Sequence, residues 1–264
     1  MGAPVEHGVA PTLQIYRDLG AATSAVARHV YARAVVSVRA RGRFSWVLVG
    51  GHTPEKLYRL LSVRYLHRFP WDRTEVYFGD ERCVPARDPE SNFAMAWESL
   101  LARVPIPARR IHRLRGELRS PARAASDYAR RLGPLAAHRD LDRALFDLVL
   151  LGIGPDGHTA SLFPNSPVLR EVRRSVVAVR RSGQPPFVPR LTLTLPALAS
   201  SREVVFLVSG PEKAAAVAAI FRALPSGSPA WPASLVRSVG RTVWFVDAAA
   251  ASELPDALRA RVAS

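Results

Sequence analysis

The sequence has almost none of the cysteine on which disulfide-linked and thiolate-metal proteins depend, and it lacks the long apolar run of a membrane-spanning protein. Cys83 is the single cysteine in 264 residues, so no disulfide can form within the chain, and a zinc site built from several thiolates is excluded. No apolar run approaches the roughly 20 residues that a membrane-spanning helix needs. The amino-terminal residues include an acidic side chain and no signal-peptide core, so we expect a cytoplasmic protein with no membrane partner.

Lysine is almost as rare, although the chain is strongly basic. Only Lys56 and Lys213 occur, so arginine supplies 35 of the 37 basic residues, and the formal net charge is +15. The arginines are dispersed, without the basic block or aromatic stacking platform that a nucleic-acid site uses. We therefore expect the charge to reflect background composition, with no specific binding of nucleic acid. A preference for anionic small molecules is compatible with this charge.

Short apolar runs alternate with helical patterns along the chain, which is 48% hydrophobic and 22% charged. The alternation predicts an α/β fold with a mostly parallel, helix-covered sheet. No low-complexity linker divides the chain, so we expect one domain over residues 1–264, with 1–12 as a loose terminus. The patterns predict strands at 44–49, 75–78, 146–151, 175–179, 191–195, 203–208 and 242–246, and helices at 21–41, from 53 onward, 91–101, 120–132 and 211–223.

Three polar segments with glycine follow predicted strands, where ligands of parallel sheets bind. The first is Gly50-Gly51-His52-Thr53-Pro54. Its glycines allow a close backbone approach to an anion, and Thr53 before Pro54 is typical of a helix start, whose free N–H groups suit a phosphate. The alternative is a plain strand-to-helix turn that needs glycine torsions, with His52 as a loop histidine.

The second segment runs from Phe78 to Pro85 and carries Asp80, Glu81 and Arg82. Two carboxylates and an arginine at a strand end can bind a polyol and a phosphate. Equally, Arg82 could form a surface ion pair with Asp80 or Glu81. Cys83 has no activating partner in the sequence, so we interpret it as structural.

The third segment, from Leu150 to Pro164, contains the pattern G-x-G-x-x-G. A dinucleotide site needs a sustained helix after the third glycine, and Pro164 and Pro167 interrupt one almost at once. What remains is His158, which follows a glycine turn with Asp156 beside it and can serve as a general base. The sequence has no G-x-S-x-G elbow, no H-E-x-x-H and no Walker A motif, so the corresponding hydrolase, zinc and nucleotide mechanisms are unsupported.

Together these segments resemble the 6-phosphogluconolactonases of the bacterial short type, within the glucosamine-6-phosphate isomerase/6-phosphogluconolactonase family. The stretch Gly152-Ile153-Gly154-Pro155-Asp156-Gly157-His158-Thr159-Ala160-Ser161-Leu162-Phe163-Pro164 is the most specific part of the likeness. The likeness continues through residues 190–194, 209–214 and 244–247 and covers nearly the whole chain. The sequence departs from the family where Val49 replaces a frequent serine and His52 replaces a small polar residue.

The resemblance implies a Rossmann-like fold of the sugar-phosphate isomerase type that needs no metal or cofactor. It implies hydrolysis of 6-phospho-D-glucono-1,5-lactone, the second step of the oxidative pentose phosphate pathway, by a monomer or weak homo-oligomer. His158 would be the base that activates water, Asp80 would orient groups within the site, and backbone N–H groups near the glycine turns would stabilise the oxyanion. The residues that would bind the substrate or its phosphate are Gly50, Gly51, His52, Thr53, Arg82, Asn92, Asp156, Gly157 and Lys213.

Two alternatives stay open. A glucosamine-6-phosphate deaminase or isomerase has the same fold, and its loop resembles G-x-D-G-H-I-A-F-N-E with an extra acid. This chain has Ser161-Leu162-Phe163-Pro164 there, without the acid. A non-catalytic sugar-phosphate sensor is the alternative from a different class of protein.

Overall fold

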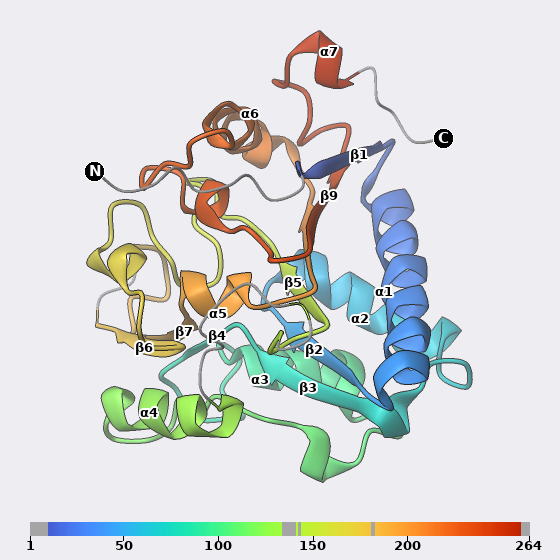
Figure 1. Ribbon diagram of the computed structural model, residues 1–264, viewed down its shortest axis with the longest axis vertical. Helices are drawn as coiled ribbons and strands as arrows, with labels where there is room; N and C mark the ends of the chain where they lie inside the picture. The colour runs from blue at the N-terminus through green and yellow to red at the C-terminus, as the bar shows by residue number, and fades with distance from the viewer. Residues whose placement is uncertain (1–9, 134–140, 142–143, 181–182, 260–264) are drawn as a thin grey trace.

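A six-stranded sheet forms the centre of the computed structural model, which describes residues 10–133, 141, 144–180 and 183–259. The strand order is β1-β9-β8-β5-β2-β3, and every neighbouring pair is parallel. This confirms the α/β prediction with a mostly parallel sheet (Figure 1). The strands are β1 (Thr12–Tyr16), β2 (Phe44–Leu48), β3 (Thr74–Phe78), β5 (Leu148–Leu151), β8 (Glu203–Val208) and β9 (Arg241–Asp247).

Helices cover both faces of this sheet. Phe245 of β9 contacts His29 of α1 (Leu19–Arg41), with ring centroids 5.4 Å apart. Its neighbour Trp244 contacts Phe221 of α6 (Ala214–Ala223) at 5.3 Å. Because successive residues of a strand point to opposite faces, α1 and α6 lie on opposite sides of the sheet. Helix α2 (His52–Arg64) packs beside α1, as Figure 1 shows in blue.

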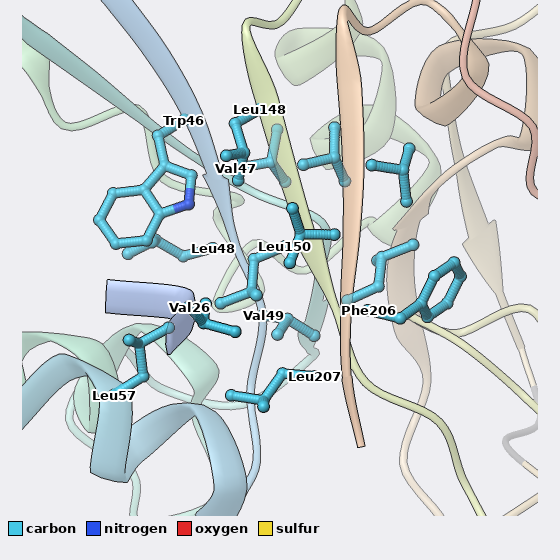
Figure 2. Packing of buried hydrophobic residues seen from close by; sticks show 14 of the residues in the cluster. Val26, Trp46, Val47, Leu48, Val49, Leu57, Leu148, Leu150, Phe206 and Leu207 are labelled. Carbon is cyan, nitrogen blue, oxygen red and sulfur yellow. The ribbon is translucent and has the colours of Figure 1, made fainter. Parts of the chain in front are cut away.

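The core is formed where the central strands are covered on both faces. Every residue of β2, β5 and β8 is buried, which explains their nearly continuous apolar sequences. Figure 2 shows side chains of these three strands meeting Val26 of α1 and Leu57 of α2. No described helix has both the length and the apolar character required to cross a membrane.

A second, antiparallel sheet of three strands lies beside the first and carries part of the polar chemistry. Its order is β4-β7-β6, built from β4 (Asp80–Arg82), β7 (Arg190–Leu193) and β6 (Val176–Val179), and α4 (Pro121–Leu132) packs against β6 and β7. Gly79 joins the two sheets, because its N–H donates to Leu48 O at 2.9 Å and its carbonyl accepts from Leu193 N at 2.8 Å. The chain therefore leaves β3 and enters the small sheet at once.

Most predicted helix starts are found as expected. Ser91 accepts from Ala94 N at the start of α3 (Asn92–Ala96), which a π-helical turn extends to Leu101, and Ser120 accepts from Arg123 N at the start of α4. The predicted helix at 211–223 begins with a 3₁₀ turn, Pro211–Lys213, before α6.

Two local predictions are wrong, and four short elements were not predicted. Thr53 is not the N-cap of α2; Gly51 is, with φ 110°, and no side chain caps this helix. Thr12 begins β1, so the predicted loose terminus ends too late, and residues 1–9 lie outside the described part of the chain. The strands β1 and β4 and the short helices α5 (Leu195–Ala199) and α7 (Asp256–Arg259) were not predicted.

Candidate active site

The three polar segments of the sequence meet at one cavity of about 380 Å³. It lies at the carboxyl ends of β2, β3, β5 and β8. Strand β3 follows β2 and pairs with it on one side, whereas β8, the next strand of this sheet after β5, lies on the far side of β5. The strand order therefore reverses between β2 and β5. Parallel sheets bind ligands at such a switch point. Of the predicted site residues, the cavity is lined by Gly50, Gly51, His52, Thr53, Asp80, Arg82, Asn92, His158 and Lys213.

His158 forms a close pair with Asp156 at this cavity. Its Nδ1 lies 2.6 Å from Asp156 Oδ1, and its backbone N–H donates to the same oxygen at 3.2 Å. Burial alone would raise the pKa of Asp156, but the hydrogen bond and charge of His158 hold that pKa at about 2. An ionised Asp156 can only accept a hydrogen bond, so the proton of His158 lies on Nδ1. In that tautomer the lone pair is on Nε2. Asp156 itself is not among the residues that line the cavity.

A compact turn presents this histidine. Gly154 N donates to His158 O at 2.8 Å, and Gly157 N donates to Gly154 O at 3.0 Å. Gly157 has φ 75°, and a Cβ there would overlap the ring of Trp231, so glycine is required. No sustained helix follows the turn, which agrees with rejecting a dinucleotide site. The N–H groups of Gly154, Gly157 and His158 have partners within the turn, so the expected oxyanion donors would be other N–H groups near the glycine turns.

A tyrosine side chain fixes the start of the turn after β2 through hydrogen bonds to the backbone. Tyr58 Oη accepts from Val49 N at 3.0 Å and donates to Val49 O at 2.9 Å. Val49, which replaces a serine frequent in the family, is thus fixed through its backbone. A Cβ on Gly50 would overlap Asn92 Oδ1, so this glycine allows a close approach. Since no side chain caps α2, its first N–H groups are available to an anion in the cavity.

Asp80 is buried and held by two donors. Asn92 Nδ2 donates to Asp80 Oδ1 at 3.0 Å, and Ser161 Oγ donates to Oδ2 at 2.6 Å. Asn92 Nδ2 also lies 3.0 Å from the Asp80 backbone oxygen. Asn92 therefore lines the cavity, but its amide donor is directed to Asp80.

Glu81 does not pair with Arg82 through its side chain. Its carboxylate accepts from Ser91 Oγ and from the backbone N–H groups of Arg82, Asn92 and Phe93, at 2.7–3.0 Å. Burial raises the pKa of Glu81 to about 7, against the hydrogen bonds, which lower it. The alternative of an Arg82 ion pair with Asp80 or Glu81 is therefore wrong, because both carboxylates are directed to other donors.

Two neighbouring guanidinium groups face the cavity. Arg82 contacts the backbone oxygen and carboxylate of Glu90, while Arg190, its cross-strand partner on β7, donates to backbone oxygens. The Nε atoms of both arginines are buried, and neither has a hydrogen-bond partner among the described residues. Buried unpaired donors are costly, and a guanidinium is suited to bind an anion in the cavity.

Arg190 was not predicted as a site residue, although it lies in the stretch 190–194 that carries part of the resemblance. Only its pairing with Arg82 distinguishes it from the many other arginines. Further cavity residues that were not predicted are Gln184, Ser209 and Glu212. Lys213 lines the cavity and makes no ion pair with a described residue. Burial raises the pKa of the Cys83 thiol to about 11. In the described part of the chain, no group of three or more His, Cys, Asp or Glu side chains is arranged to hold a metal ion.

Known proteins resemble this chain over nearly its full length. Residues 17–244 match the family described as glucosamine-6-phosphate isomerases/6-phosphogluconolactonase. The 6-phosphogluconolactonase of Streptomyces coelicolor is 37% identical over 254 residues, covering 94% of this chain and 96% of that protein. The 6-phosphogluconolactonase of Mycobacterium tuberculosis is 40% identical over 254 residues, covering 92% and 98%.

Among solved structures, the 6-phosphogluconolactonase of Thermotoga maritima has a TM-score of 0.78 and 32% identity, covering 90% of this chain and all of that one. With these matches the chain belongs to the glucosamine-6-phosphate isomerase/6-phosphogluconolactonase family.

Proposed function

We propose that the protein hydrolyses 6-phospho-D-glucono-1,5-lactone to 6-phospho-D-gluconate in the oxidative pentose phosphate pathway. The observation that carries the proposal is the His158–Asp156 pair, which opens onto the same cavity as several anion-binding groups. A base and an anion site within one cavity fit a phosphorylated substrate that reacts with water. The 6-phosphogluconolactonases to which the chain is similar give the substrate class.

His158 acts as general base and then as general acid. The Nδ1–H group of His158 donates a hydrogen bond to Asp156. Nε2 takes a proton from water while the water oxygen bonds to the lactone carbonyl carbon. The resulting tetrahedral intermediate carries its negative charge on the former carbonyl oxygen. When the bond between that carbon and the ring oxygen breaks, the imidazolium returns its proton to the ring oxygen. The ring opens to a carboxylic acid, which ionises.

The phosphate is held at the other side of the cavity. The amino end of α2 offers backbone N–H groups at Gly51, His52 and Thr53, together with the Thr53 hydroxyl. Arg82 and Lys213 supply positive charge, and Arg190 adds a second guanidinium beside Arg82. Asp80, held by Asn92 and Ser161, is a rigid acceptor for a sugar hydroxyl.

The test is an assay of lactone hydrolysis, corrected for spontaneous ring opening. We expect rapid hydrolysis of the 6-phosphorylated lactone, slower hydrolysis of glucono-1,5-lactone, and no release of ammonia from glucosamine 6-phosphate. Release of ammonia would favour the deaminase instead. Phosphate-dependent binding without turnover of either compound would favour a sensor.

A further inference from the structure

A glutamine from a distant part of the chain completes the contacts of Asp156. Gln184 lies between β6 and β7 and lines the cavity. Its Nε2 donates to Asp156 Oδ2 at 3.2 Å, whereas His158 Nδ1 is at Asp156 Oδ1. The two oxygens of one carboxylate thus have different partners, one on the histidine turn and one on the segment before β7.

We propose that Gln184 is a positioning residue that fixes Asp156, and through it the orientation and tautomer of His158. This inference rests on the proposed function only where turnover is the measurement. A carboxylate with one partner can rotate about its terminal torsion and exchange that partner for water, because the side chain of Asp156 is 26% exposed. A second donor on the other oxygen removes that freedom.

The segment that carries Gln184 is itself tied to a buried strand. Arg190 Nη2 donates to the backbone oxygens of Gln184 at 3.2 Å and Pro186 at 3.0 Å. Arg190 is only 4% exposed. The Gln184 amide is therefore presented by a backbone that cannot move far without breaking its hydrogen bonds to a buried arginine.

A neutral amide suits this position. Glutamine donates a hydrogen bond to Asp156 without adding charge beside the Asp156–His158 pair. A carboxylate here would add negative charge beside His158, and an ammonium would add positive charge. The charged or titratable groups that otherwise line the cavity come from α2, β4, β7 and the turn before α6, and replacing Gln184 alters none of them; they are His52, Asp80, Arg82, Arg190, Glu212 and Lys213.

The experiment compares Gln184→Leu and Gln184→Glu with the wild-type protein. For Gln184→Leu we expect kcat to fall about tenfold, while KM changes less than about twofold, because the hydrogen bond that is lost goes to the charged Asp156 and not to the substrate. For Gln184→Glu the acid limb of kcat/KM should move to higher pH, since that limb reports the free enzyme's base. The matched control is Phe187→Ala in the same segment, where the side chain is 76% exposed.

A measurement without turnover separates this inference from the proposed function. The imidazole Nδ1–H proton of His158 is observed by NMR and assigned by its loss in His158→Asn. We expect faster exchange of this proton with water in Gln184→Leu and wild-type behaviour in Phe187→Ala. Unchanged exchange in Gln184→Leu, or an unmoved acid limb in a folded Gln184→Glu, would overturn the positioning role. Failure of the wild-type protein to hydrolyse the lactone would instead refute the proposed function and leave the NMR result decisive for Gln184.

Discussion

At the scale of single residues, the proposed general base His158 gives the most direct test of the mechanism. Replacing His158 with asparagine removes Nε2 as a base and keeps the approximate size of the side chain. We expect kcat to fall roughly 10²–10⁴-fold with little change in KM, because the phosphate contacts remain. Steady-state kinetics of His158→Asn check this, with His67→Asn, which lies outside the cavity, as the control. Unchanged turnover would show that another group activates water.

Arg82 tests the phosphate site at the same scale. A guanidinium can give two parallel hydrogen bonds to phosphate, whereas lysine gives a point charge. We expect Arg82→Lys to raise KM for the phosphorylated lactone about tenfold or more, and to change hydrolysis of glucono-1,5-lactone little. Arg59→Lys is the matched control, because Arg59 pairs with Glu55 on α2 and is absent from the cavity. Equal losses on both lactones would contradict direct phosphate binding.

Asp156 links the site to stability in acid. Its pKa is lowered from the ordinary 3.8 to about 2 in the folded protein. A lowered pKa contributes stability that is present above the unfolded value and is lost as the pH falls through the folded value. We expect wild type to exceed Asp156→Asn in free energy of unfolding by about 1–2 kcal/mol at pH 5, with the difference shrinking between pH 4 and pH 2. Urea unfolding across this range measures it, and a constant difference would refute the linkage.

At the scale of elements, two buried tyrosines hold neighbouring strands at the ends that face the site. Tyr58 of α2 bonds both backbone groups of Val49, which follows β2. Tyr128 of α4 accepts from Phe78 N at the end of β3, at 2.9 Å. The segments that begin directly beyond these points carry Gly50 and Asp80. The helices thus set where the two polar segments start.

The Tyr58→Phe variant should loosen the first of these segments. It leaves a buried N–H and a buried C=O of Val49 without partners, so we expect a loss of about 1–3 kcal/mol in unfolding free energy. KM for the phosphorylated lactone should rise more than kcat falls, because the turn that offers N–H groups to the phosphate shifts. Tyr31→Phe is the control, since no hydrogen bond of the Tyr31 hydroxyl occurs among the described residues. Thermal unfolding and KM together decide; equal behaviour of the two variants would contradict the role.

At the scale of the whole molecule, some of the arginines form ion pairs with carboxylates that are buried at the amino ends of strands in the large sheet. Asp147, just before β5, lies within 4 Å of Arg41 and Arg202. Glu203 begins β8 and pairs with Arg33, Arg241 and His29. These groups lie at the opposite end of the strands from the cavity, so their charge serves the fold.

The net charge of +15 predicts weak, salt-sensitive association with nucleic acid. A cationic surface releases counterions from any polyanion, so binding should fall steeply with added salt and show no sequence preference. Titration of random and selected oligonucleotides over a salt series measures this, with lactone hydrolysis followed in the presence of competitor DNA. Tight, sequence-dependent binding near physiological salt would contradict the expectation that the charge is background composition.

Elements whose signals are local could be predicted from the amino-acid sequence alone. The run from Glu203 to Val208 was predicted with the bounds of β8, because a strand covered on both faces is continuously apolar. Ser91 and Ser120 marked helix starts through contacts within three residues. The glycine turn that carries Asp156 and His158 was likewise visible, because its chemistry is contained in five consecutive residues.

Contacts between groups that are distant in the sequence could not be predicted in this way, because they depend on tertiary packing. Arg82 is adjacent in sequence to two carboxylates, but α3 donates hydrogen bonds to Glu81 and Ser161 donates one to Asp80. Strand β7 places Arg190 beside Arg82 instead. Gln184 is 28 residues from Asp156, and no periodic pattern links them. Hydrophobic period and turn chemistry depend on near neighbours, whereas the partner of a polar side chain depends on which strands and loops the packed core brings together.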